Sequence, residues 1–177
     1  MNESSVLSNR CVMDEATLRR TYRRIFRRNL LLFYLGSGLM AVFGLLLILL
    51  TGGLSPFPGF LLIAAALYLF LGLRQPGKQA RRQIARYEES GSAPNPEVTV
   101  WFREEELSAI RAGMGEQTRI SYDSMNAILP DKDRIILWTE AKQFVVLDVS
   151  RFENGTEADF WRLMKEKCRH ALPKSRR

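Results

Sequence analysis

The sequence predicts a membrane α+β protein, in which a two-helix transmembrane hairpin carries a small antiparallel β domain closed by a C-terminal helix. Three observations support this fold class. Residues 29–73 contain no charged side chain. Basic residues crowd both ends of this apolar run. From residue 97 onward, short stretches of alternating apolar and polar residues precede one amphipathic segment, which is the pattern of a sheet followed by a helix.

The apolar run is too long for one membrane crossing. As a single helix it would extend over more than about 60 Å, whereas the hydrocarbon core of a bilayer is about 30 Å thick. A break is visible in the stretch TGGLSPFPG at 51–59, because glycine and proline disfavour a continuous helix. Spans are therefore predicted at 30–50 and 56–73, with Ser55 as the cap of the second.

Two other interpretations of the apolar run agree less well with the sequence. A cleaved signal peptide would not begin about thirty residues into the chain, and a second span would not follow it. A helical hairpin inside a soluble protein would need a large partner to cover apolar side chains on all faces of both helices. The transmembrane interpretation needs neither assumption.

Basic flanks determine the predicted orientation of the hairpin. The stretch LRRTYRRIFRR at 18–28 precedes the first span, a second basic stretch at 77–89 follows the other span, and the loop between the spans has no charge. Basic residues next to spans are retained in the cytoplasm. We therefore expect a multi-pass protein of the cell (inner or plasma) membrane, with 18–89 forming the hairpin and its flanking helices and with both termini cytoplasmic.

Ten basic residues of the two flanks are the candidate membrane-interface residues. Near an anionic surface each can contribute about 1 kcal/mol of attraction to lipid head groups. The alternative remains open that these charges only determine the orientation of the spans in the membrane. The first flank also carries an apolar helical stripe, whose Tyr22 and Phe26 are expected near the membrane interface. The ten residues are Arg19, Arg20, Arg23, Arg24, Arg27, Arg28, Arg74, Lys78, Arg81 and Arg82.

The composition of the spans indicates an anchor. They contain no Asp, Glu, Lys, Arg or His, which proton relays and ion pathways normally need inside the membrane. Small residues, including Ser37 and Gly44 in the first span and Ala65 in the second, allow the helices to approach closely. An oligomeric small transport or channel component is the alternative.

Residues 97–172 are predicted to form a cytoplasmic β domain after the turn-rich linker SGSAPNP at 90–96. In EVTVWFR, Val98, Val100 and Phe102 alternate with the residues between them, as in a strand with one buried face. The apolar runs IILW and FVVL are expected at the sheet centre. Six strands are predicted, at 97–103, 106–112, 116–122, 125–130, 134–139 and 142–149.

A C-terminal helix is predicted to close the β domain. Thr156 is a suitable N-cap, and Asp159 three residues later can complete a capping box. An apolar face then continues through residue 172 and can cover an open end of the sheet. This face contains Phe160, Trp161, Leu163, Met164, Cys168 and Leu172, and a basic tail follows at 173–177.

The residues with reactive side chains form no catalytic constellation in the sequence. Cys11 and Cys168 lack metal-ligand spacing, and a cytoplasmic location would keep both thiols reduced. His170 and the acidic run Glu104–Glu106 are expected to be solvated surface groups. The chain has no phosphate-binding glycine loop and no nucleophile elbow. We therefore expect no enzyme activity, no cofactor and no metal.

The net charge of +7 belongs to the flanks and the tail rather than to the β domain. Residues 97–171 hold more acidic than basic side chains. A nucleic-acid-binding domain is expected to carry positive charge on its own folded surface, so nucleic acid is not an expected partner. The same acidity disfavours lipid capture by the domain itself. The expected partners are the lipid bilayer and either a protein or a second copy of the chain.

Four stretches of the β domain and its helix read VTVWFREEELSAIRAG, ISYDSMNAILPDKDRIILW, FVVLDVSRF and FWRLMKEK. Together with the two spans and their basic flanks, they resemble the YcxB-like family of bacterial membrane proteins. The resemblance covers nearly the whole chain and rests on patterns of hydrophobic and aromatic residues. It implies a pleckstrin-homology-like soluble domain and brings no established catalytic residues.

A pleckstrin-homology-like sheet has seven strands, one more than the sequence predicts after the linker. We hypothesise that VLSNRCV at 6–12, within the N-terminal segment 1–17, supplies the missing first strand. The hairpin would then be an insertion between the first two strands. The predicted function is a binding, scaffold or regulatory role for a membrane-anchored module.

Overall fold

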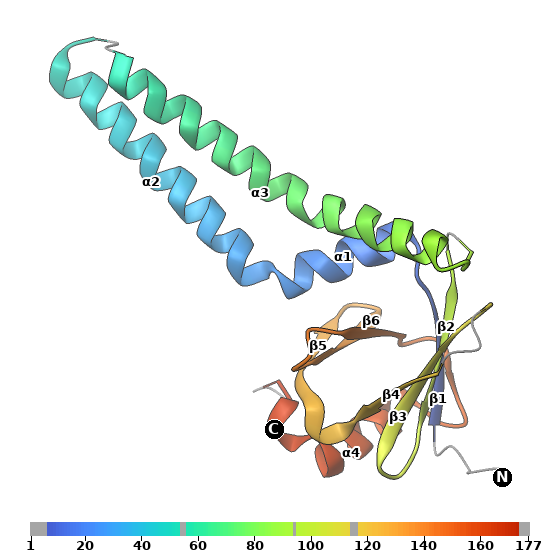
Figure 1. The fold of residues 1–177 in the computed structure, drawn as a ribbon. Helices are drawn as coiled ribbons and strands as arrows, with labels where there is room; N and C mark the ends of the chain where they lie inside the picture. Colours follow the sequence, from blue (N-terminus) through green and yellow to red (C-terminus); the bar gives the residue numbers. More distant parts are fainter. Residues whose placement is uncertain (1–6, 54–55, 94, 114–116, 174–177) are drawn as a thin grey trace.

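A long helical hairpin projects from a β domain (Figure 1). The computed structural model describes residues 7–53, 56–93, 95–113 and 117–173. The elements follow one another as β1 (Leu7–Val12), α1 (Glu15–Ile25), α2 (Arg27–Thr51), α3 (Pro56–Glu89), β2 (Glu97–Phe102), β3 (Glu106–Arg111), β4 (Gln117–Ser121), η1 (Tyr122–Ser124), β5 (Met125–Asp131), β6 (Arg134–Thr139), β7 (Phe144–Asp148), β8 (Phe152–Glu153), α4 (Glu157–Lys167) and η2 (Arg169–Ala171).

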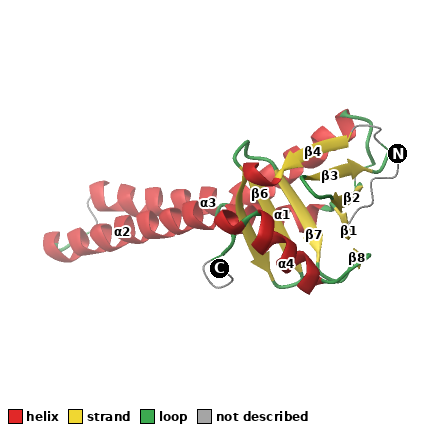
Figure 2. Ribbon diagram, turned by 90° about the horizontal axis from the view of Figure 1, so that it is seen from below, coloured by secondary structure: helices red, strands yellow, loops and turns green. Residues whose placement is uncertain are grey.

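Two antiparallel sheets form the β domain (Figure 2). Buried side chains from both sheets belong to one hydrophobic core. The first sheet has the strand order β4-β3-β2-β1-β8, and the second has the order β5-β6-β7. All six strands predicted after the linker are present, with small differences at their ends. The sequence did not indicate β8, because a strand of two residues is too short to show a period of two.

Strand β1 lies in the same sheet as β2, although three long helices separate the two strands in the chain. The pairing is antiparallel and runs from Leu7 opposite Phe102 to Val12 opposite Glu97. This is the pairing that the hypothesis of an N-terminal first strand requires, while Val6 lies outside the described residues. The helical hairpin is therefore inserted between two neighbouring strands.

The expectation that IILW and FVVL both lie at the sheet centre is wrong for FVVL. Strand β6 is central in its sheet, but β7 pairs with β6 alone among the described strands. The apolar character of β7 comes instead from the covering of both its faces. Val145 and Leu147 face the main core, whereas Val146 packs beneath α1 and α3 with Leu18 and Tyr87.

Helix α4 closes the main core, and its predicted capping box is confirmed. The Thr156 hydroxyl accepts a hydrogen bond from the Asp159 N–H (3.3 Å), and the Asp159 carboxylate accepts one from the Thr156 N–H (2.9 Å). The Phe160 ring follows directly and meets the Phe102 ring edge-on, with 5.6 Å between centroids. The cap therefore sets the point from which the helix turns its apolar face to the sheets.

Helix α4 is shorter than predicted, because it ends at Lys167 rather than continuing through residue 172. Cys168 leaves the helical conformation, with φ of −130° and ψ of 40°. The 3₁₀ turn η2 that follows brings Ala171 and Leu172 onto the core, where both are buried. The apolar face thus continues to Leu172 as predicted, but by a tighter turn.

The capping box predicts a pH dependence of stability. The hydrogen bonds from the Thr156 hydroxyl and N–H lower the pKa of Asp159 below its ordinary 3.8. A lowered folded-state pKa stabilises the fold above the unfolded-state pKa, and this contribution is lost as pH falls through the folded-state value. The stability advantage of wild type over Asp159→Ala should be full above about pH 4 and shrink below it. Urea unfolding at several pH values checks this, and a pH-independent difference would contradict it.

Helix α1 and the C-terminal half of α3 lie side by side over the β domain (Figure 1). Leu18, Ala80 and Tyr87 of these helices share a buried cluster with Val146 of β7. Helix α1 does not run straight into α2, because the chain turns between them at Phe26. The first basic flank is therefore a separate helix that packs on the domain.

Helix α3 is continuous from Pro56 to Glu89, so the second predicted span and its basic flank form one helix. Pro76 lies within it, although proline has no N–H to donate to the preceding turn. At the other end, Gly52 adopts the left-handed conformation that favours glycine (φ 70°) where α2 ends. Asn29–Thr51 and Pro56–Glu89 are both long and apolar enough to cross a membrane.

Small residues allow α2 and α3 to pack closely, as the composition of the spans predicted. Ser37, Gly44 and Ala65 are buried within the hairpin. A further close approach lies nearer the β domain, where a Cβ placed on Gly72 would lie 2.9 Å from the Phe33 ring. A side chain at this position needs a rearrangement of the two helices.

We expect Gly72→Leu to destabilise the helical hairpin by about 1–3 kcal/mol, because the added side chain forces α2 away from α3. Gly38→Leu is the matched control, since a Cβ on Gly38 meets no described atom within 4 Å. Titration with a denaturing detergent, followed by helical circular dichroism, measures the difference. Equal behaviour of the two variants would contradict this account of the hairpin.

Candidate functional site

Helix α1 is attached to the β domain by two arginines that the sequence placed among the membrane-interface candidates. Arg20 lies 2.9 Å from the carboxylate of Asp133 and 3.6 Å from that of Asp131. Arg24 donates a hydrogen bond to the carbonyl of Pro130 (3.0 Å). These contacts tie α1 to the β5–β6 turn, so Arg20 and Arg24 act in docking the helix on the domain.

The other eight candidates do not form one site. Arg81 pairs with Glu15 (3.2 Å) and so links α3 to α1. The Arg74 guanidinium lies over the Phe70 ring, 4.1 Å from its centroid. The side chain of Arg28 lies outside the described part, and contact of the group with anionic lipid stays a prediction. The remaining members are all exposed: Arg19, Arg23, Arg27, Lys78 and Arg82.

A cleft of about 780 Å³ lies between the helix layer and the β domain. Its lining comes from α1, α3 and strands of both sheets, so no single stretch of sequence contains it. Small-molecule sites in proteins typically enclose several hundred Å³. The cleft is therefore the candidate ligand site of this protein.

Aromatic side chains form much of the helix wall of the cleft. The Tyr22 and Phe26 rings stack with centroids 5.9 Å apart, and Tyr22 also meets the edge of the Phe144 ring at 5.3 Å. Burial raises the pKa of Tyr22, whose hydroxyl donates to Gln83 Oε1 (3.4 Å). Tyr22 and Phe26 thus line the cleft, and their position at the membrane interface stays a prediction.

The sheet wall of the cleft is apolar where it meets the core and polar at the β6–β7 turn. Val98 and Ala109 pack against the main core and line the cleft. Trp138 is half-buried beside them, at the end of β6. Glu140 and Lys142, in the following turn, are exposed. A ligand in the cleft would meet hydrocarbon and charge within one site.

Cationic side chains outnumber acidic ones among the described residues of the cleft lining. Arg86, Arg111 and Lys142 line it together with one carboxylate, that of Glu140. The Arg111 guanidinium lies over the Tyr87 ring, 4.1 Å from its centroid, and this cation–π contact holds its position. The cleft therefore combines aromatic surface with an excess of positive charge.

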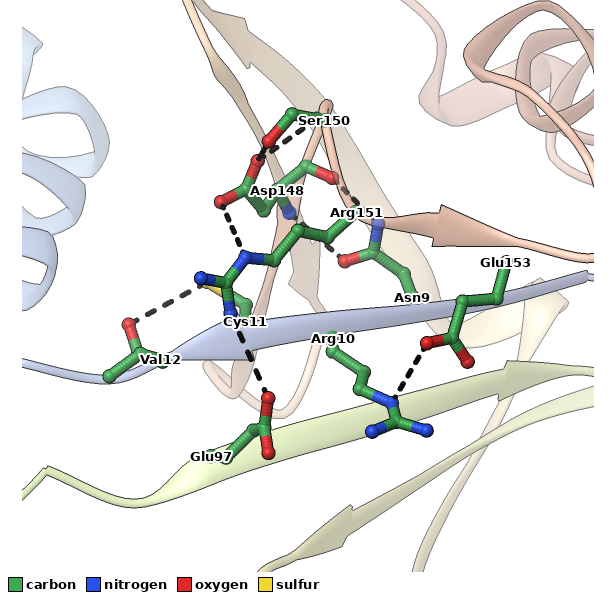
Figure 3. A network of polar contacts seen from close by, with 9 residues as sticks. All are labelled: Asn9, Arg10, Cys11, Val12, Glu97, Asp148, Ser150, Arg151 and Glu153. Carbon is green, nitrogen blue, oxygen red and sulfur yellow. Dashed lines mark hydrogen bonds and ion pairs between the residues drawn. The ribbon is translucent and has the colours of Figure 1, made fainter.

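A polar network fixes β1 against the second sheet (Figure 3). Asn9 is fully buried, and its amide donates to the Asp148 carbonyl (2.7 Å) and accepts from the Asp148 N–H (3.0 Å). Arg151 lies 3.9 Å from the Asp148 carboxylate and 3.8 Å from that of Glu97. The network positions β1, and hence the start of α1, relative to β7, whose Phe144 lines the cleft.

The reactive residues singled out in the sequence do not meet in the cleft. Burial raises the pKa of both Cys11 and Cys168 to about 11, so both thiols are protonated at neutral pH. His170 is exposed, with Nε2 2.8 Å from the Met125 carbonyl oxygen. Within the described ranges, no group of three His, Cys, Asp or Glu side chains could hold a metal ion.

The acidic run lies beside a second hollow, of about 470 Å³, at the β2–β3 turn. Glu104 and Glu105 are exposed, and Glu106 pairs with Arg119 (3.6 Å). This arrangement agrees with the expectation of a solvated turn.

Sequence reasoning missed the cleft because its residues lie on separate segments of the chain. The apolar stripe of Tyr22 and Phe26 was a signal for one wall, but Arg111 and Trp138 carried none. No protein-family model and no curated protein matches the chain. The geometry of the cleft is therefore the main guide to function.

Proposed function

We propose that the protein is an integral protein of the cell (inner) membrane that presents a pleckstrin-homology-like β domain in the cytoplasm as a non-catalytic binding module. The observation that carries this proposal is the cleft, because it is a hollow of ligand size built jointly by the helical extensions of the hairpin and by the β domain. A ligand in it contacts both parts at once. Such binding suits a scaffold or regulatory role.

Exposed apolar surface on α2 and α3 supports membrane insertion. Leu39, Leu49 and Leu50 are 72%, 80% and 74% exposed. Soluble proteins rarely leave a continuous apolar surface of this extent uncovered. The Ser37 hydroxyl donates to the Tyr34 carbonyl of its own helix (3.0 Å), which supports an anchor over a polar channel lining.

The arrangement of strands supports the pleckstrin-homology-like assignment. Strands β1 to β4 form one antiparallel meander, strands β5 to β7 form a second, and α4 closes the core. The insertion of the hairpin between β1 and β2 brings both of its ends to the same domain. This connection supports a topology with both termini in the cytoplasm.

Extraction of membranes with alkaline carbonate tests the anchor. We expect the chain to stay in the membrane fraction, because two uncharged spans hold it in the bilayer. Release into the soluble fraction would contradict the membrane part of the proposal.

A photoreactive benzoyl-phenylalanine at Phe144 tests the cleft as a binding site in intact cells. Phe152 is the matched control position, since it is also a half-buried phenylalanine but lies on β8, outside the described cleft lining. We expect a discrete adduct at 144 and little at 152. No adduct at 144, or the same adducts at both positions, would contradict a ligand site in the cleft.

A further inference from the structure

We propose that the cleft binds an anionic lipid of the cytoplasmic leaflet, with its head group between α3 and the β6–β7 turn. The inference rests on the proposed function and names the ligand class of the same site. The chemistry required is a phosphate or carboxylate attached to an apolar chain. Charge, apolar surface and proximity to the hairpin each support this ligand.

The charge of the cleft favours an anion. Arg86 comes from α3, Arg111 from β3 and Lys142 from the β6–β7 turn, so three separate elements place cations on one hollow. Among the described lining residues only Glu140 opposes them. Guanidinium groups bind phosphate and carboxylate through paired N–H donors, and a lysine adds a mobile point charge. A cationic ligand would be repelled by the same set.

The apolar side chains of the cleft lining indicate that the ligand carries an apolar group as well as a negative charge. Phe26, Trp138 and Phe144 are half-buried in the cleft lining. A small soluble anion would leave these rings in contact with water. An attached hydrocarbon chain removes them from water, which is the favourable direction of the hydrophobic effect. The mixed lining therefore fits an amphiphile.

The position of the cleft favours the bilayer as the source of the amphiphile. Phe26, which lines the cleft, lies between α1 and α2, and its carbonyl accepts the N–H of Leu30, the first residue of the predicted span (2.8 Å). The cleft wall is therefore one helical turn from the apolar run. A lipid beside α2 can move its head group into the cleft without leaving the leaflet. A soluble phosphate ester is the competing source.

Quenching of Trp138 fluorescence by brominated lipid tests the inference on the full-length chain in phosphatidylcholine nanodiscs. The signal of Trp138 is the difference between wild type and Trp138→Phe. We expect brominated phosphatidylglycerol to quench it at a lower lipid fraction than brominated phosphatidylcholine. Arg86→Gln with Lys142→Gln should raise the half-saturating fraction about tenfold or more. The matched control is Arg162→Gln with Lys165→Gln, which removes two exposed cations of α4 and should change nothing.

Several outcomes would overturn the inference. Equal quenching by the two brominated lipids would show no anion preference, and an unchanged response of Arg86→Gln with Lys142→Gln would place the lipid elsewhere. Arg86→Lys with Lys142→Arg keeps the charge, and we expect it to keep the quenching; loss in both pairs would indicate damage to the fold and overturn the assignment of these cations. Full displacement by a small excess of glycerol 3-phosphate would overturn the lipid source.

The two proposals fail in different ways. If the probe at Phe144 gives a discrete adduct while brominated lipid gives no selective quenching, the cleft is a binding site for another ligand and the lipid inference fails alone. If the probe gives no discrete adduct, the proposed function itself fails.

Discussion

Replacement of Phe160 by alanine is expected to lower the free energy of unfolding of the β domain by about 3–5 kcal/mol. Phe160 has no exposed surface, and its ring lies 5.6, 5.7 and 5.1 Å from the rings of Phe102, Phe152 and Trp161. Truncation removes these contacts and leaves a cavity beneath α4. Domains are stable by only about 5–15 kcal/mol, so the loss is a large fraction of the total.

Urea unfolding of the detergent-solubilised protein, followed by tryptophan fluorescence, measures this loss. Phe43→Ala is the matched control, because Phe43 lies on α2 and is 51% exposed. It should leave the unfolding of the β domain unchanged. A loss below about 1 kcal/mol for Phe160→Ala, which is the typical effect of any substitution, would contradict the packing described for α4.

Substitution of Asn9 should have the second large effect, a loss of about 2–4 kcal/mol in Asn9→Ala. The buried amide of Asn9 satisfies both the N–H and the carbonyl of Asp148 at the edge of β7. Its removal leaves the Asp148 N–H without this acceptor, while the Asp148 carbonyl keeps the hydrogen bond from the Arg151 N–H (3.1 Å). An unsatisfied buried N–H costs about 1–3 kcal/mol, and the lost bond to the carbonyl adds about 1 kcal/mol. The direct side-chain link from β1 to the end of β7 is lost as well.

Asn9→Asp separates hydrogen bonding from volume, because aspartate has nearly the same shape. It can accept from the Asp148 N–H, but it brings a carboxylate oxygen against the Asp148 carbonyl. We expect it to be at least as unstable as Asn9→Ala at neutral pH, while Asn126→Ala, at an exposed position, should be close to wild type. Urea unfolding and the exchange rate of the Asp148 amide measure both effects. Wild-type stability of Asn9→Asp would show that the side chain only fills space.

Local sequence patterns were sufficient for most of the secondary structure. The alternation of Val98, Val100 and Phe102 depends only on which face of β2 is buried, and the Thr156 cap depends on atoms three residues apart. Such signals survive in a single sequence because the interacting groups are close in the chain. The continuous apolar run of β7 did not determine its place in the sheet. Such a run occurs in a central strand, which has a neighbour on each side, and equally in an edge strand whose two faces are both covered.

The tertiary contacts that build the site were beyond those patterns. In the sequence, nothing distinguishes Arg20 and Arg24 from the other arginines of the run. Only the fold shows that Arg20 pairs with Asp131 and Asp133. The cleft likewise needs Arg86 of the helix layer and Arg111 of the sheet to line the same hollow. No local period or spacing indicates that residues so far apart in the chain line one cleft. The sequence therefore predicted the helical hairpin and the β domain, but not the cleft between them.

The pairing of β1 with β2 sets an order of events during synthesis. Strand β1 leaves the ribosome before both apolar helices, and its partner is made only after them. Under the proposed topology, β1 stays unpaired until α3 has returned the chain to the cytoplasm, and the long separation makes this closure slow. A chain that inserts one helix alone has β1 and β2 on opposite sides of the bilayer and cannot complete its first sheet. Under the proposed topology, folding of the β domain would therefore report correct membrane insertion, and an unpaired β1 would mark the misinserted chain for proteolysis.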